Sequence, residues 1–196
     1  MPPRCIETIC LLDGQLQNLE QHNARLNQSR RVLYDSHDEW DLGQLITLPQ
    51  NIETGLFKCR VVYGKILEKI EFEPYTIRPI KVLKLVTAND LDYAFKYQDR
   101  AHLLQLFAQR GQADDVLIIK NGLLTDTSYA NVAFWDGARW LTPALPLLAG
   151  TKRAQLLQNG ELLEQKIRVQ ELANFSCTRI FNAMFDQQTD ATFLSE

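Results

Sequence analysis

The sequence predicts an α+β fold, on three observations. Turn dipeptides recur between apolar or alternating segments, which is the strongest short-range signal for β-hairpins. Segments with helical spacing and helix-end signals lie among them. These helices do not alternate strictly with the strands, as they would in a parallel α/β protein. We therefore expect mainly antiparallel strands with a few interspersed helices.

Four hairpins are expected, because each turn dipeptide contains a glycine, and glycine, asparagine and aspartate tolerate a positive φ. The four dipeptides are Asp13-Gly14, Gly64-Lys65, Asn121-Gly122 and Asp136-Gly137. Late in the chain, Thr178–Phe185 is apolar enough to predict a further, buried strand.

Three helices are expected. Asn18 and Gln21 have the spacing of a capping box at the start of the first, and Thr151 is placed to cap the third. The expected spans are about 18–34, 99–110 and 151–160, with a short turn at 171–175. The polar, acidic stretch Thr87–Asp92 predicts a junction between a small N-terminal α+β lobe, 1–88, and a larger C-terminal lobe, 89–196.

Composition excludes several classes of function. The 196 residues are 45% hydrophobic and carry a formal net charge of −3, which argues against a nucleic-acid partner. No apolar run approaches the roughly 18–20 residues of a membrane span, and the N-terminus lacks the apolar stretch of a signal peptide. The four cysteines lack Cys-x-x-Cys spacing and predict free thiols in the cytoplasm. The histidines, His22, His37 and His102, are scattered, so no metal site is expected.

Lys96 is the first candidate for chemistry, because it lies among Tyr93, Phe95 and Tyr97. Partial burial would lower the pKa of its ammonium group and make the amine nucleophilic enough to form a Schiff base. A solvated lysine that extends past aromatic rings fits the same stretch.

Two further stretches have both a functional and a structural interpretation. Asp126 could bind a protonated ring nitrogen, or could simply form an Asx-turn between strands. The amides of Gly150, Thr151 and Lys152 stand where a loop meets a helix, which predicts an anion site or only an ordinary helix start.

Three arginines are candidates for binding anions. Arg25, on the first helix, could hold a phosphate with two parallel hydrogen bonds. Arg60 and Arg78 lie on or beside expected strands and could bind a substrate carboxylate. Each of the three could instead face solvent.

Taken together and in order, these stretches resemble the class IV aminotransferases, the fold-type IV enzymes that use pyridoxal 5'-phosphate (PLP). That family includes branched-chain and D-amino-acid aminotransferases and 4-amino-4-deoxychorismate lyase. The resemblance rests on Glu7-Thr8 … Asp13-Gly14 … His22-Asn-Ala-Arg25-Leu26, on Thr125-Asp126 … Ser128-x-x-Asn131, on Leu141-Thr142-Pro143 … Leu148-Ala-Gly150-Thr-Lys-Arg153, and on Ile180-Phe-Asn182-Ala183.

The resemblance implies a two-lobed fold whose C-terminal lobe carries the PLP lysine, Lys96. Arg25 becomes a phosphate ligand, and Gly150 with the backbone amides of Thr151 and Lys152 completes the phosphate site. Asp126, where the family usually has Glu, faces the pyridine nitrogen. Substrate contacts are assigned to Thr8, Arg60 and Arg78.

The resemblance also implies a homodimer that acts on a small amino acid and 2-oxo acid pair. The chain begins close to the first hairpin, so we expect the N-terminal strands of larger members to be shortened. An aminodeoxychorismate lyase, which releases p-aminobenzoate and pyruvate, is the alternative within the same chemistry. A non-catalytic binding or regulatory protein with this fold is the alternative of another class.

Overall fold

A computed structural model describes residues 3–50, 52 and 54–195, and these fall into two compact units. The first unit comprises the described residues up to Ile77, together with Phe95–Asp99. The second comprises Arg78–Ala94 and the described residues from Arg100 onward. This division differs from the expected boundary after residue 88. Residues 78–88 belong with the second unit, and Lys96 belongs with the first.

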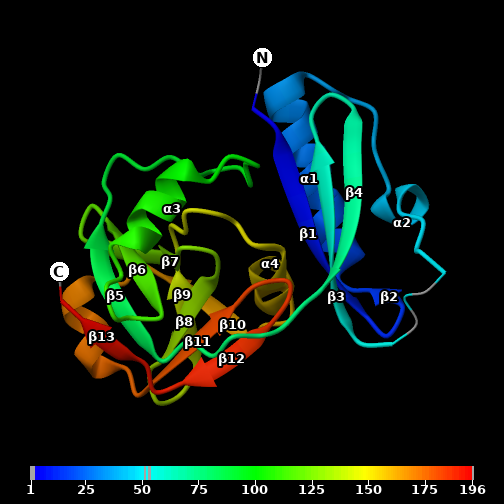
Figure 1. Cartoon of the computed structure of the whole chain (residues 1–196). Helices are drawn as coiled ribbons and strands as arrows, with labels where there is room; N and C mark the ends of the chain where they lie inside the picture. The colour runs from blue at the N-terminus through cyan, green and yellow to red at the C-terminus, as the bar shows by residue number, and fades with distance from the viewer. Residues whose placement is uncertain (1–2, 51, 53, 196) are drawn as a thin grey trace. The chain divides into compact units, whose positions relative to one another are not determined.

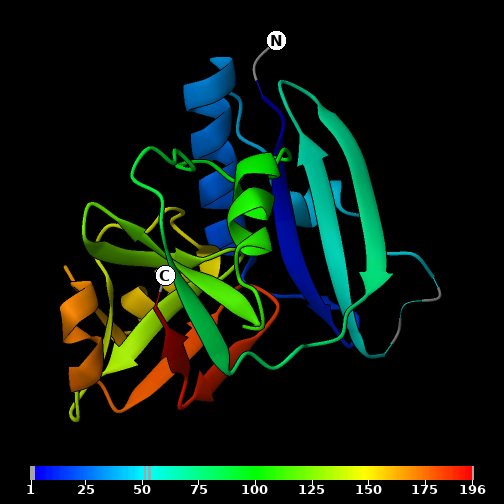
Figure 2. The same cartoon turned by 60° about the vertical axis from the view of Figure 1, so that its left-hand side comes forward.

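The first unit is a four-stranded antiparallel sheet of order β2-β1-β3-β4, with α1 packed against β1 (Figures 1 and 2). The turn at Asp13-Gly14 has φ of 47° and 75°, so the first expected hairpin is confirmed, and Gly64-Lys65 lies in the second hairpin's turn. The elements are β1 (Cys5–Leu12), β2 (Gln15–Leu16), α1 (Leu19–Tyr34), α2 (Leu42–Leu45), β3 (Leu56–Tyr63) and β4 (Leu67–Pro74).

Helix α1 confirms the first predicted helix but not its predicted cap. Asn18 has a left-handed backbone, with φ 57°, and makes no side-chain capping hydrogen bond, so the capping box is wrong. The helix is held instead by its buried face, because Leu26 and Tyr34 pack into a core with Ile9 and Val61 of the sheet. Tertiary burial, rather than the local end signal, stabilises this helix.

Residues 96–98 pair with the edge of β1, which explains why they belong to the first unit. The amide of Ile6 donates to the carbonyl of Lys96 at 2.9 Å, and the amide of Gln98 donates to the carbonyl of Arg4 at 2.8 Å. The rings of Phe95 and Tyr97 pack against the core of the first unit. The two aromatic neighbours of Lys96 therefore anchor its backbone.

The second unit contains two sheets, of order β13-β5-β6-β7 and β10-β9-β8-β11-β12 (Figure 1). The hairpins at Asn121-Gly122 and Asp136-Gly137 join β6 to β7 and β8 to β9 and are confirmed. The strands are β5 (Val82–Thr87), β6 (Asp115–Lys120), β7 (Leu123–Thr127), β8 (Asn131–Trp135), β9 (Trp140–Pro143), β10 (Leu162–Gln165), β11 (Cys177–Phe181), β12 (Asp186–Thr189) and β13 (Thr192–Leu194).

Most strand pairs are antiparallel, as expected, but three pairs are parallel. β5 pairs in parallel with β6 and with β13, and β9 pairs in parallel with β10. Parallel neighbours require a crossover connection. Helix α3 (Ala101–Ala108) lies in the connection from β5 to β6, and α4 (Thr151–Gln158) lies in that from β9 to β10.

The helix ends of the second unit also differ in detail from the expectation. Gly150, not Thr151, is the N-cap of α4, and Thr151 is its first residue. The late strand ends at Phe181, because the amide of Met184 donates to the side chain of Asn182 and turns the chain. The short turn expected at 171–175 overlaps a 3₁₀ helix, Val169–Asn174, which Phe175 caps. None of the helices in the described part of the chain has the length and apolar character to cross a bilayer.

Candidate active site

A buried carboxylate organises the first unit. Glu7 points from β1 toward α1 and is 0% exposed. Nε and Nη2 of Arg25 donate to its two oxygens at 2.9 and 2.5 Å. Nδ1 of His22 lies 2.6 Å from Oε2 of Glu7. His22 and Arg25 are three residues apart on α1, so both face the same strand. We call Glu7, His22 and Arg25 the Glu7 cluster.

The electrostatics of the Glu7 cluster fix its protonation. Burial alone would raise the pKa of Glu7, but the charge of Arg25 and the hydrogen bond from His22 lower it to about 2. Burial lowers the pKa of His22, which is therefore neutral at pH 7. Because the ionised Glu7 can only accept, Nδ1 of His22 carries the proton and Nε2 does not. The cluster is thus an ion pair with an oriented, neutral imidazole.

Lys96 lies beside this cluster, within the same unit. Its positive charge, like that of Arg25, acts to lower the pKa of His22. The side chain is partly buried, and its backbone is fixed by the pairing with β1. The structure therefore brings two residues predicted from the sequence, Lys96 and Arg25, to one region of the first unit.

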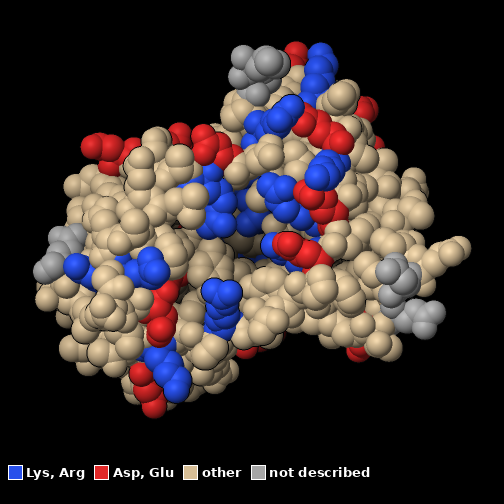
Figure 3. Space-filling view, viewed as in Figure 1, with Lys and Arg blue, Asp and Glu red and all other residues tan. Residues whose placement is uncertain are grey.

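Thr8 and Arg60 occupy the opposite face of the same sheet. They are direct partners in the β1–β3 register, and both are partly buried. Nη1 of Arg60 donates to Glu71 of β4 at 3.1 Å. Positive and negative side chains alternate over β3 and β4 (Figure 3). Arg78, in contrast, is exposed in the connection between β4 and β5, so it is not grouped with Thr8 and Arg60.

The second unit contains its own buried carboxylate, Asp126 on β7. Nδ2 of Asn131 donates to Oδ1 of Asp126 at 2.8 Å, and the amide of Leu148 donates to Oδ2 at 3.0 Å. Burial raises the pKa of Asp126 to about 6, although both hydrogen bonds lower it. A buried carboxylate of this kind gains from a cationic partner.

The segment at the start of α4 adjoins Asp126 through Asn131. A Cβ on Gly150 would lie 2.0 Å from Oδ1 of Asn131, so only glycine fits there. Thr151 is buried, and the first amides of a helix have no acceptor within that helix. The side chain of Lys152 donates to Gln155 at 3.2 Å and lies 4.0 Å from Asp186, so Lys152 can contribute its backbone amide to a ligand. We call Asp126, Asn131, Leu148 and Gly150 the Asp126 cluster.

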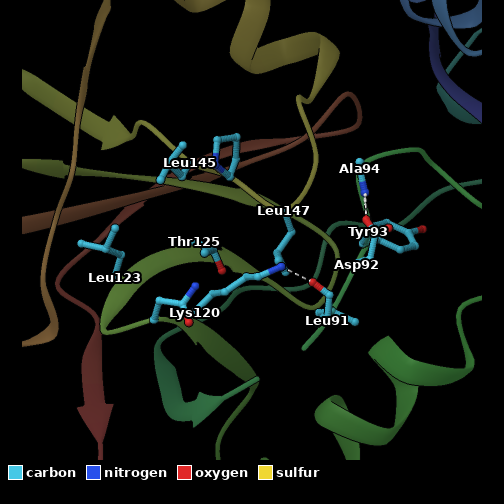
Figure 4. A pocket seen from close by; sticks show the side chains of 11 residues that line it. Leu91, Asp92, Tyr93, Ala94, Lys120, Leu123, Thr125, Leu145 and Leu147 are labelled. Atoms are coloured by element: carbon cyan, nitrogen blue, oxygen red, sulfur yellow. Dashed lines mark hydrogen bonds between the residues drawn. The ribbon is translucent and has the colours of Figure 1, made fainter. Parts of the chain in front are cut away.

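A pocket of about 260 Å³ opens in the second unit beside this cluster (Figure 4). Thr125 and Leu147, the neighbours of Asp126 and Leu148, line it together with Lys120 and Leu91. Nζ of Lys120 donates to the carbonyl of Leu91 at 2.5 Å. This bond ties the segment that precedes Lys96 to the β6–β7 hairpin. The residues lining the pocket include none of the site residues predicted from the sequence.

Sequence reasoning assigned no role to Glu7, His22 or Asn131. An acidic residue within the apolar strand Cys5–Leu12 is a signal for a buried ion pair, and a histidine three residues before Arg25 is a signal for a shared target. Asn131 belongs to the stretch Ser128-x-x-Asn131 that carries the family resemblance, but its contacts with Asp126 and Leu148 arise only when β7, β8 and the loop before α4 meet.

The family model for amino-transferase class IV matches residues 66–186, more than half of the chain. The chain belongs to this family. The resemblance drawn from the sequence is thereby confirmed, and the chain is an enzyme of this family. Among the described residues, no group of three or more His, Cys, Asp or Glu side chains is placed to hold a metal ion.

Two relatives match over most of the chain. A Haemophilus influenzae protein described as uncharacterized is 38% identical over 180 residues, which cover 91% of this chain and 96% of the relative. A Schizosaccharomyces pombe protein, provisionally named an aminodeoxychorismate lyase, is 37% identical over 192 residues, with 88% of this chain and 83% of the relative covered.

Solved structures confirm the α+β, fold-type IV class. A provisional 4-amino-4-deoxychorismate lyase from Haemophilus somnus is 31% identical and superposes with a TM-score of 0.87, covering 93% of this chain and 96% of that one. A provisional amino-acid aminotransferase from Mesorhizobium loti, 21% identical, shares the fold with a TM-score of 0.82, covering 97% and 99%. A hypothetical Mycobacterium tuberculosis aminotransferase in its PLP-bound form, 19% identical, shares it with a TM-score of 0.77, covering 97% and 81%.

Proposed function

We propose that this enzyme uses PLP, and that Lys96 binds the cofactor aldehyde covalently. The observation that carries the proposal is the position of Lys96, whose backbone is pinned to β1 and whose charge acts on the Glu7 cluster. We assign the cofactor phosphate to Arg25 and to the backbone at Gly150, Thr151 and Lys152.

The residues of the second unit fit this cofactor. Asp126 is 5% exposed, and burial raises its pKa to about 6, so a cationic ring nitrogen would relieve the cost of its ionisation. Gly150 places no side chain over the first turn of α4, where amides and the helix dipole favour an anion. PLP carries a ring nitrogen and, apart from it, a phosphate, so its site needs a carboxylate for the first and an anion site for the second. The Asp126 cluster supplies both, through Asp126 and through the helix start at Gly150.

Each residue has a defined task in the proposal. When bound, PLP serves as an electron sink for the carbon next to the substrate nitrogen. Lys96 would move a proton at the reacting carbon as general base and acid. Asp126 keeps the ring nitrogen protonated. Arg25, held by Glu7, orients the phosphate and thereby the reacting atoms.

Two reactions fit this machinery, and relatives above 30% identity favour one of them. The S. pombe and H. somnus proteins, 37% and 31% identical, both carry provisional aminodeoxychorismate lyase names. We therefore propose cleavage of aminodeoxychorismate to p-aminobenzoate and pyruvate as the reaction. Transfer of an amino group between a small amino acid and a 2-oxo acid is the second candidate, which family membership supports.

Thr8 and Arg60 are assigned to the substrate. Their register places a hydroxyl and a guanidinium on one sheet face, away from Glu7. Such a pair suits a carboxylate-bearing substrate, although Arg60 would have to share its charge with Glu71. Arg78 is exposed in this structure and is retained as a substrate residue from the family resemblance alone.

A homodimer and a cytoplasmic location complete the proposal, the latter supported by four free thiols.

The first experiment tests the covalent attachment. PLP is added to the purified protein, the absorbance is followed, and the complex is reduced with borohydride and digested for mass spectrometry. The proposal predicts a cofactor-sized adduct on Lys96 that is absent from Lys96→Ala. Lys84→Ala, which changes a partly buried lysine of β5, is the matched control and should retain the adduct. An adduct at another lysine, or a colourless protein, would overturn it.

The second experiment separates the two reactions. Release of p-aminobenzoate from aminodeoxychorismate is measured alongside formation of 2-oxo acids from amino donors. Lyase activity that Thr8→Val lowers at least tenfold, with the adduct on Lys96 intact, supports the first candidate. Amino transfer without p-aminobenzoate release would support the second, and a holoenzyme with neither activity would favour a binding role.

A further inference from the structure

Asn131, the first residue of β8, links three segments through one buried side chain. Nδ2 donates both to Oδ1 of Asp126 at 2.8 Å and to the carbonyl of Leu148 at 2.9 Å. The amide of Leu148 returns a hydrogen bond to Oδ2 of Asp126 at 3.0 Å. These bonds close a ring that joins β7, β8 and the loop before α4.

The orientation of the Asn131 amide follows from this ring. An amide nitrogen has two hydrogens and cannot accept, and both of its partners here are acceptors. Oδ1 of Asn131 must therefore face the other way, toward Gly150, where a Cβ would lie only 2.0 Å from it. Asn131 thus contacts the carboxylate at one end and the N-cap of α4 at the other.

We infer that Asn131 is a positioning residue that couples the two ends of the PLP site. Through Asp126 it orients the group that faces the ring nitrogen, and through Leu148 and Gly150 it sets the position of the amides that bind the phosphate. The inference rests on the proposed function for its ligand, but its geometry lies wholly within the second unit. A change of charge on Asp126 is transmitted to the first turn of α4.

The test uses the protein without cofactor, so that it does not depend on activity. Amide resonances of Gly150, Thr151 and Lys152 are followed by NMR between pH 4.5 and 8. In the wild type they should titrate together, with a midpoint near the Asp126 pKa of about 6. Arg153 of α4 also acts on Asp126 and remains charged over this range. Asp126→Asn should abolish the titration and thereby assign it.

Asn131→Ala should reduce the titration at 150–152 while Asp126 still ionises, because the link through Asn131 is lost and only the hydrogen bond from Leu148 to Asp126 remains. The pKa of Asp126 should rise, because one donor to its charged form is lost. Asn131→Asp keeps the shape of the side chain but replaces a donor by an acceptor and adds a second negative charge beside Asp126. The midpoint of the Asp126 titration should therefore move to higher pH. This second variant keeps the test decisive if Asn131→Ala does not fold. Asn182→Ala is the control, since the Asn182 side chain donates to the carbonyl of Tyr129 at 3.3 Å and accepts from the amide of Met184 at 2.7 Å, and neither bond involves Asp126 or the start of α4.

The affinity for PLP gives a second readout. Asn131→Ala should weaken binding of PLP about tenfold while Asn182→Ala leaves it unchanged. Titration that persists unaltered at 150–152 in Asn131→Ala would overturn the inference, as would its absence in the wild type. Titration as expected in a protein that forms no adduct on Lys96 would instead leave the coupling in place and refute the proposed function.

Discussion

Oε2 of Glu7 on β1 lies 2.5 Å from Nη2 of Arg25 on α1, and Glu7 is completely buried. The arginine proposed to bind the phosphate is therefore itself bound by a carboxylate. The two parallel hydrogen bonds hold the guanidinium in one plane, a geometry that a lysine cannot reproduce. Glu7 also holds His22, so one acid orients two side chains of α1.

Glu7→Gln should destabilise the protein, because it leaves the partly buried Arg25 without the charge of Glu7. Breaking such a buried pair costs about 3 kcal/mol. The pKa of Glu7 is lowered from 4.5 to about 2, so its contribution is complete above pH 4.5 and is lost as the pH falls toward 2. Urea unfolding at pH 7 and pH 3.5 should show a smaller difference between variant and wild type at the lower pH. Glu71→Gln, which alters a more exposed pair, should change stability much less than Glu7→Gln does.

Arg25→Lys should weaken PLP binding even though the charge is kept. A lysine offers a point charge and cannot bind Glu7 through two parallel bonds. We expect about a tenfold higher Kd for PLP by fluorescence titration, equivalent to about 1.4 kcal/mol. Arg31→Lys, on the same helix but paired with the exposed Glu39, is the matched control. Equal affinities for the two variants would contradict a phosphate role for Arg25.

Asp126→Asn should change the pH dependence of stability without cofactor. Burial raises the pKa of Asp126 from 3.8 to about 6, so the folded protein binds this proton more tightly than the unfolded chain. Wild-type stability therefore falls relative to Asp126→Asn as the pH rises from 4 to 8, by about 3 kcal/mol.

Asp136→Asn should show the opposite trend and serves as the control for Asp126→Asn. Hydrogen bonds from Ala138 and Arg139 lower the pKa of Asp136. Its contribution is present near neutral pH and is lost on acidification. Thermal unfolding across the pH series measures the stability of both variants. Parallel curves of stability against pH for Asp126→Asn and the wild type would refute the prediction for Asp126.

Gly150→Ala should be poorly tolerated, because its new methyl group would lie 2.0 Å from Oδ1 of Asn131. Overpacking of this kind costs about 1–3 kcal/mol, and displacement of Asn131 should also weaken PLP binding. Gly64→Ala, where the nearest atom lies 3.6 Å away and φ is not positive, is the control. Calorimetry should show a lower Tm for Gly150→Ala only.

The sequence alone determined the local features of this protein. The four glycine-containing turns form as expected, because a turn is set by a few neighbouring residues. Gly14, Gly122 and Gly137 adopt a positive φ in their turns, whereas Gly64 does not. The order of the family motifs also carried the assignment to the class IV aminotransferases, which the family model bears out.

Only the tertiary structure decided which residues meet. Lys96 belongs with the first unit because Phe95 and Tyr97 pack on that unit's core, a contact that no nearby residue specifies. Parallel pairing of β5 with β6 depends on a crossover through α3. Glu7 meets Arg25 and Asn131 meets Asp126 because burial makes an unpaired polar group costly, and burial is a property of the assembled core rather than of the local chain.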